Sequence, residues 1–205
     1  MNTSGAVFDP APGYARVKVV GSFHELVTTR FDGGVNALCW PRQLPGDFDE
    51  VATQLGPLTE ITPIDEDCLL SLRLSPVGAA ARDILREDQR RLREAGLDPS
   101  LDAVPPLPCD PNAGPVSLDV QTFHVDSATA ATDTWLCSYN EAASLGLRND
   151  EARREVDIPA IRAQLLRLYG GADDAGFAAY LHERFFDLHY DPVPAARPFS
   201  FGLGN

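Results

Sequence analysis

The amino-acid sequence predicts an α+β protein, because strand-like and helix-like patterns both recur along its 205 residues. Residues 15–20 and 35–40 are short runs rich in apolar and β-branched residues, which is typical of strands. Residues 75–96 and 157–191 instead place apolar side chains three or four positions apart, as amphipathic helices do. A hydrophobic content of 44% is enough for one well-buried domain.

The first half of the chain is expected to be mixed. Residues 1–13 are rich in proline, glycine and small polar residues and should form a flexible leader, whereas residues 14–205 should form a single domain. Residues 24–31 are expected to continue the sheet begun by residues 15–20. A helix over residues 47–55 should end at the Gly-Pro pair that follows it. The longest helix should begin at Ser75-Pro76, an N-cap and a first-turn proline, and end at Gly96.

The second half is expected to carry a β-hairpin followed by helices. Six prolines over residues 98–115 argue against a regular element there. The strand patterns of residues 116–126 and 134–139 predict the two arms of the hairpin. Helices beginning near residues 157 and 173 should form a helical insertion over approximately residues 151–191, and residues 197–205 should be extended.

Charge and composition exclude several classes of partner. The formal net charge is −13, and no stripe of basic residues offsets it, so nucleic acid and anionic membrane surfaces would be repelled. No apolar run approaches the roughly 18 residues of a membrane span, and no signal peptide precedes the domain. A cytoplasmic protein that acts on a small-molecule substrate is therefore expected. The four cysteines are scattered and should be free thiols.

The segment Phe123-His124-Val125-Asp126 is the strongest candidate for a functional site. Residues two apart on a strand project to the same face, so His124 and Asp126 could bind one metal ion. An imidazole nitrogen and a carboxylate oxygen are two members of the 2-His-1-carboxylate triad of non-haem iron enzymes. The alternative is a histidine at a strand end whose neighbour Asp126 caps a turn.

This arrangement resembles the double-stranded β-helix, a jelly-roll or cupin-like core, of the 2-oxoglutarate/Fe(II)-dependent dioxygenase superfamily. The stretch from Asn36 to Trp40-Pro41-Arg42, taken with His124 and Asp126, also resembles an uncharacterised bacterial family that shares the His-x-Asp motif. The resemblance implies a non-haem Fe(II)-dependent oxygenase in which His124, Asp126 and a distal histidine bind Fe(II). It also implies 2-oxoglutarate as co-substrate, held by a basic residue after the distal histidine.

The resemblance leaves two alternatives for the third ligand. His189 precedes Arg197 by eight residues, so His189 would be the distal metal ligand and Arg197 the partner of the 2-oxoglutarate carboxylate. His182 and His189 both fall on a predicted helix, however, whereas the superfamily's distal histidine lies on a strand; His182 is better explained as a helix-surface residue. In the second alternative the distal histidine lies beyond residue 205 and the chain is incomplete.

Two competing functions follow from the same motif. One is a non-catalytic ligand-binding or accessory protein on the same scaffold, with an incomplete metal site. The other is a cupin-type metalloenzyme that uses a different divalent metal without 2-oxoglutarate. The presence of a third metal-competent side chain beside His124 and Asp126 separates an enzyme from the binding protein. The sequence does not specify the substrate or the oligomeric state.

Overall fold

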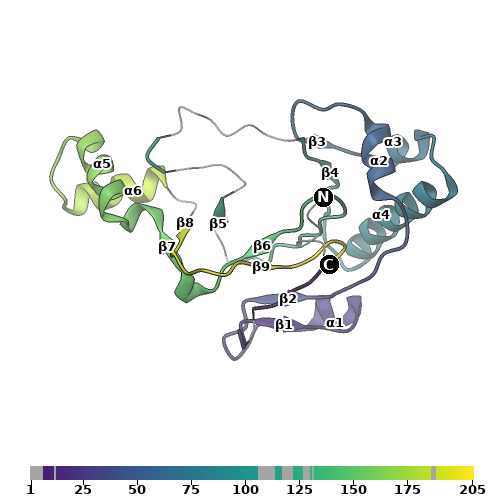
Figure 1. Cartoon of the computed structure of the whole chain (residues 1–205), viewed down its shortest axis with the longest axis horizontal. Coiled ribbons are helices and arrows are strands. Elements are labelled where there is room, and N and C mark those ends of the chain that lie inside the picture. Colours follow the sequence, from purple (N-terminus) through teal and green to yellow (C-terminus); the bar gives the residue numbers. More distant parts are fainter. Residues whose placement is uncertain are drawn as a thin grey trace.

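The computed structural model describes residues 7–11, 13–105, 114–116, 122–126, 130, 132–185 and 188–205. The described residues form both helices and several small, separate sheets, which fits the predicted α+β class. Helices α2, α3 and α4 gather at one end of the molecule and helices α5 and α6 at the other, with strands β6 and β9 between them (Figure 1). Most of the expected leader, residues 1–6 and 12, lies outside the described residues.

The N-terminal sheet pairs two of the predicted strands. Strand β1 (Val17–Val19) runs parallel to strand β2 (Ala37–Cys39), and helix α1 (Phe23–Thr28) lies between them in the chain. The prediction of a strand over residues 24–31 was therefore wrong. The Ser22 side chain accepts a hydrogen bond from the Glu25 backbone N–H at 3.1 Å, and the Glu25 carboxylate accepts one from the Gly21 N–H at 2.8 Å. These capping bonds begin a helix despite the β-branched residues that follow.

Three helices form the first core. Helix α2 (Phe48–Leu55) and helix α4 (Pro76–Glu94) confirm two predictions, and a short helix α3 (Glu66–Ser71) lies between them. Asp47, Asp65 and Ser75 are their N-caps; each side chain accepts a backbone N–H from the first turn. The buried residues at the centre of this core are Val51, Ile64, Leu69, Ala81 and Leu85.

A two-stranded sheet closes this core. Strand β3 (Thr62–Pro63) pairs antiparallel with strand β4 (Asp102–Ala103), and the Ile64 backbone N–H donates to the Leu101 carbonyl oxygen at 2.8 Å. The proline-rich segment thus contains a short strand, contrary to prediction, because Asp102 and Ala103 lie in a gap between its prolines. Residues 106–113 of that segment lie outside the described residues.

A three-stranded antiparallel sheet carries the candidate site. Strand β8 (Leu188–Pro192) lies in the middle, with β5 (Phe123–Val125) on one side and β7 (Ala152–Arg154) on the other. The predicted hairpin was wrong, because β5 pairs with β8 and the described residues 132–139 are not in a strand. The predicted strand residues 117–121 lie outside the described residues.

Helices α5 (Pro159–Tyr169) and α6 (Ala175–Arg184) form a second core between β7 and β8 in the chain. Its buried residues are Val116, Val156, Leu165, Phe177 and Leu181. The first helix confirms its prediction, but the second ends at Arg184, so the predicted helix to residue 191 was wrong. Pairing of β8 with strands on both sides outweighs the local helical spacing of its apolar residues.

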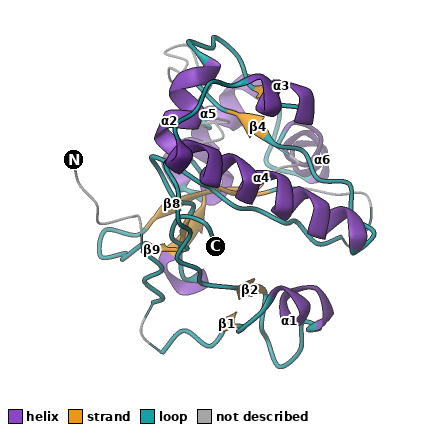
Figure 2. Cartoon of the chain, turned by 90° about the vertical axis from the view of Figure 1, so that its right-hand side faces the viewer, coloured by secondary structure: helices purple, strands orange, loops and turns teal. Residues whose placement is uncertain are grey.

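The remaining strands complete a set of small sheets. Strand β6 (Leu145–Gly146) pairs antiparallel with β9 (Phe199–Ser200), which lies within the C-terminal segment expected to be extended. The described strands form one three-stranded and three two-stranded sheets, and these do not close into a barrel. In the view of Figure 2, helix α4 lies across the middle of the molecule and the β1–β2 pair lies below it. Among the described helices, none combines the length and apolar character of a membrane span.

Candidate functional site

The structure brings His124 and His189 face to face across two neighbouring strands. His124 on β5 and His189 on β8 are direct partners in the antiparallel register. Their ring centroids are 5.6 Å apart and their ring planes are inclined by 28°. His189 therefore lies on a strand and not on the helix that its sequence spacing suggested. The predicted helix was the argument against His189 as the distal ligand, and that argument no longer holds.

Asp126 lies on the His124 side of this pair. Its Oδ1 atom is 3.3 Å from His124 Nε2, and the Asp126 side chain is 67% exposed whereas that of His124 is 26% exposed. His124 and Asp126 are separated by one residue at the end of β5, so the expected projection to a common side is observed. The three predicted metal ligands thus occupy one corner of the sheet.

The proton on His124 can be placed from its neighbours. His124 Nδ1 is 2.7 Å from the Thr122 carbonyl oxygen, which can only accept a hydrogen bond. Nδ1 must therefore carry a proton and donate. In neutral imidazole Nε2 then presents a lone pair toward the Asp126 carboxylate oxygen, and two acceptors at 3.3 Å repel each other. A cation placed between Nε2 and the carboxylate oxygen would relieve that repulsion.

His189 is held in a more enclosed environment. Its side chain belongs to a residue that is only 6% exposed, at the centre of the three-stranded sheet. Its Nδ1 atom is 2.9 Å from the Thr122 hydroxyl oxygen. Thr122 consequently contacts both histidines, one through its carbonyl oxygen and the other through its hydroxyl. The pattern Thr122-x-His124-x-Asp126 was visible in the sequence as residues on one strand face, but Thr122 was not recognised as part of the site.

The ligand atoms of this site are of the types that bind divalent transition metals. Two imidazoles and one carboxylate are the ligands of a facial triad. Two ligands bound at about 2.1 Å and at right angles are roughly 3.0 Å apart, so the 3.3 Å between His124 Nε2 and Asp126 Oδ1 is close to one edge of such a site. As the side chains lie, however, no group of three or more His, Cys, Asp or Glu residues in the described ranges is placed to hold a metal ion. The Asp126 side chain is exposed, so it has room to change its rotamer.

The other predicted residues lie apart from the histidine pair. Arg197 is exposed in the connection between β8 and β9, and its backbone N–H donates to the Glu151 carboxylate at 3.2 Å. Among the described residues, no hydrogen bond or ion pair links its guanidinium to either histidine. His182 is exposed in the last turn of α6, which is compatible with the helix-surface role assigned to it.

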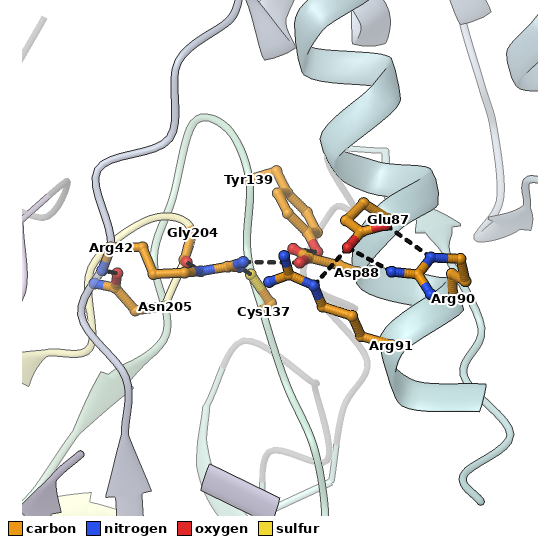
Figure 3. Close-up of polar contacts among 9 residues, drawn as sticks. All are labelled: Arg42, Glu87, Asp88, Arg90, Arg91, Cys137, Tyr139, Gly204 and Asn205. Atoms are coloured by element: carbon orange, nitrogen blue, oxygen red, sulfur yellow. Dashed lines mark hydrogen bonds and ion pairs between the residues drawn. The ribbon is translucent and has the colours of Figure 1, made fainter. Parts of the chain in front are cut away.

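A second polar cluster joins the chain after β2 to helix α4 (Figure 3). Arg42 Nη1 is 2.8 Å from Asp88 Oδ1, and both side chains are only 12% exposed. Tyr139 donates its hydroxyl to the second Asp88 oxygen at 2.9 Å, and Arg42 Nη2 contacts Cys137 Sγ at 3.5 Å. Arg42 Nε donates to the Gly204 carbonyl oxygen.

The electrostatics of this cluster indicate a structural role. Burial tends to lower the Arg42 pKa, but the hydrogen bond and charge of Asp88 raise it above its ordinary value, so the guanidinium stays charged. Burial, and then the neighbouring Cys137 and Asp88, raise the pKa of Tyr139. The charged groups here are paired with each other, and no described polar side-chain atom that is buried lacks a partner. We therefore assign the Arg42 cluster to the fold and not to catalysis.

The surface of α4 beside this cluster carries exposed ion pairs. Glu87 accepts hydrogen bonds from Arg90 and Arg91, which lower the Glu87 pKa to about 2 (Figure 3). Such a network is typical of a solvated helix face. A surface depression of about 410 Å³ lies elsewhere and contains none of the predicted site residues; its lining residues are Val27, Ala95, Leu97, Thr132, Asp133 and Trp135.

No family model, curated protein or solved structure matches this chain. The resemblance to the dioxygenase superfamily therefore stays a prediction from the residues of the motif.

Proposed function

We propose that this protein is a non-haem Fe(II)-dependent oxygenase that oxidises a small molecule with 2-oxoglutarate as co-substrate. The observation that carries the proposal is the direct cross-strand pairing of His124 with His189, with Asp126 beside His124. In this proposal the β5–β8–β7 sheet belongs to a double-stranded β-helix core, with α5 and α6 inserted between two of its strands.

The three side chains have distinct roles in this proposal. His124 and His189 supply neutral imidazole nitrogens, and Asp126 supplies a carboxylate oxygen that partly neutralises the metal charge. A bound Fe(II) would supply the activation of dioxygen. His189 lies on the central strand and is paired with His124 of β5, whereas the Asp126 side chain is exposed and free to rotate toward the ion. Arg197 is proposed to bind the far carboxylate of 2-oxoglutarate through its guanidinium.

Metal binding by the purified apoprotein is the first test. Anaerobic titration with Fe(II), and with Co(II) as a spectroscopic substitute, should give one bound ion per chain. His124→Ala, Asp126→Ala and His189→Ala should each abolish stoichiometric binding. The matched controls are His182→Ala and Asp98→Ala, which remove the same side chains from exposed positions outside the site and should leave the titration unchanged. Full binding by all three site variants would refute the proposed ligand set.

Turnover of 2-oxoglutarate is the second test. In the proposed reaction 2-oxoglutarate and dioxygen give succinate and carbon dioxide; one oxygen atom enters succinate and the other enters the substrate. Even without the natural substrate, slow iron-dependent release of succinate is expected from the wild type and not from Asp126→Ala, provided that a reductant such as ascorbate is supplied to reduce the second oxygen atom to water. Arg197→Ala should raise the 2-oxoglutarate concentration needed for half-maximal rate. Metal binding with no succinate release would instead favour the cupin-type enzyme.

A non-catalytic binding protein is the second candidate function. It is favoured by the finding that the three side chains do not converge on one ion as they lie in the described structure. In that case neither Fe(II) nor Co(II) should bind at micromolar concentration. The titration described above separates the two candidates without knowledge of the substrate.

A further inference from the structure

Thr122 contacts two histidines that lie on different strands, and in each of them the contact is to the Nδ1 atom. Its carbonyl oxygen is 2.7 Å from His124 Nδ1, and its hydroxyl oxygen is 2.9 Å from His189 Nδ1. It directly precedes β5 in the chain, so its backbone is anchored by the β5–β8 register that also pairs the two histidines. Thr122 is partly buried, which protects both contacts from competing water.

We propose that Thr122 is the positioning residue that sets the tautomer of both histidines. The carbonyl oxygen can only accept, so it fixes His124 with the proton on Nδ1. The hydroxyl can either donate or accept, and we assign it as the acceptor of the Nδ1 proton of His189 across the 2.9 Å contact. Both rings then present Nε2 as the unprotonated nitrogen, which is the form that binds a divalent metal ion. This inference rests on the proposed metal site and names the residue that prepares it.

The two contacts respond differently to substitution, which makes the proposal testable. Thr122→Val keeps the carbonyl oxygen and the side-chain shape but removes the hydroxyl. His124 should therefore keep its proton on Nδ1, whereas His189 should lose its preference and populate the form protonated on Nε2. Thr122→Ser retains the hydroxyl and should restore the wild-type behaviour of His189. A merely structural threonine would not change one histidine and spare the other.

The experiment is nitrogen NMR of the metal-free protein labelled with ¹⁵N-histidine, at a pH where both rings are neutral. In the wild type both Nδ1 atoms should have the chemical shift of a protonated ring nitrogen. In Thr122→Val only His189 should change, and Thr62→Val, a threonine substitution on strand β3, should change neither. A wild-type His189 protonated on Nε2, or a Thr122→Val spectrum identical to the wild type, would overturn the proposal.

Metal affinity provides the second readout. Loss of a group that orients a histidine ligand lowers metal affinity about 10- to 100-fold. Thr122→Val should weaken Co(II) binding to that extent, and Thr122→Ser should recover it. The NMR measurement needs no metal, so it tests the role of Thr122 independently of the proposed metal site. Absence of Co(II) binding by the wild type would refute the proposed function, whereas unchanged affinity in Thr122→Val would refute the role of Thr122.

Discussion

Arg42 and Asp88 form an ion pair, 2.8 Å between Nη1 and Oδ1, that ties the segment after β2 to the middle of helix α4. The same guanidinium donates to the Gly204 carbonyl oxygen and lies 4.6 Å from the centre of the Trp40 ring. Segments far apart in the sequence are thus held together by one side chain. The Trp40-Pro41-Arg42 stretch, which carried part of the family resemblance, has a structural explanation in this contact.

Asp88→Ala should destabilise the protein by about 3 kcal/mol or more, because it leaves the buried charge of Arg42 without the opposite charge that pairs with it. The hydroxyl of Tyr139 would lose its acceptor at the same time. Urea unfolding followed by far-UV circular dichroism measures the change. The control is Arg86→Ala, which breaks an exposed ion pair with Glu66 and should cost within about 1 kcal/mol. Equal effects of the two substitutions would contradict the assigned role.

The helices of this protein could be predicted from the sequence because their signals are local. Ser75-Pro76 at the start and Gly96 after the end of α4 specify that helix without reference to other segments. Asp47 and Gly56 do the same for α2. Helix α1 was missed because its capping residues, Ser22 and Glu25, were given less weight than the β-branched residues after them.

The strands, and with them the third site residue, depended on long-range pairing. Residues 188–192 continue the apolar spacing of α6, and only their pairing with β5 and β7 makes them a strand. The sequence predicted His124 and Asp126 as candidate ligands from their spacing and left His189 as one of two alternatives for the third. Its partner across the sheet is 65 positions away in the chain, and no local pattern specifies that register. The role of Thr122 depends on the same pairing.

Gly46→Ala should destabilise the protein more than Gly56→Ala, which alters the other end of helix α2. Gly46 has φ of +120°, and a Cβ atom built there would lie 2.6 Å from the Ala81 backbone nitrogen in α4. Ala81 is fully buried, so the loop before α2 would have to move away from the core. Strain from the positive φ adds about 1 kcal/mol or more, and overpacking a further 1–3 kcal/mol or so.

The matched control for this prediction is Gly56→Ala. Gly56 also has a positive φ, +80°, but a Cβ atom there would meet nothing within 4 Å. Gly56→Ala should therefore lower the free energy of unfolding only by the cost of the backbone strain, about 1 kcal/mol. Thermal unfolding of both variants measures the difference, and an equal loss in both would show that the close approach to Ala81 is relieved without cost.

Divalent metal ions should raise the unfolding temperature if the proposed site forms. A ligand that binds only the native state at about 100 times its dissociation constant stabilises the protein by about 2.7 kcal/mol. Co(II) should therefore shift the midpoint upward in the wild type, and an excess of chelator should reverse the shift. His189→Ala should show no shift, whereas His24→Ala, an exposed histidine in α1, should respond as the wild type does. A shift that persists in His189→Ala would place the ion elsewhere.

Alkaline pH should destabilise the protein through Cys39. This thiol is 3% exposed, and burial followed by the neighbouring Cys137 raises its pKa from 9.0 to about 11. Between those values the unfolded chain releases the thiol proton and the folded chain retains it, so stability falls as pH rises. The loss from this group is about 1.4 kcal/mol per pH unit across that window and is absent below pH 9 or so.

Cys39→Ala isolates this contribution, because alanine does not titrate. The free energy of unfolding, measured in urea at several values from pH 8 to 10.5, should fall less steeply in Cys39→Ala than in the wild type. Cys68→Ala, at a partly exposed position, should keep the wild-type slope. The slopes are compared and not the absolute stabilities, since the small cavity left by alanine lowers stability equally at every pH. Parallel curves for the wild type and Cys39→Ala would mean that the thiol ionises as readily in the folded chain as in the unfolded chain. That result would contradict the prediction, because the Cys39 side chain is buried against the Phe201 carbonyl oxygen and its charged form is disfavoured there.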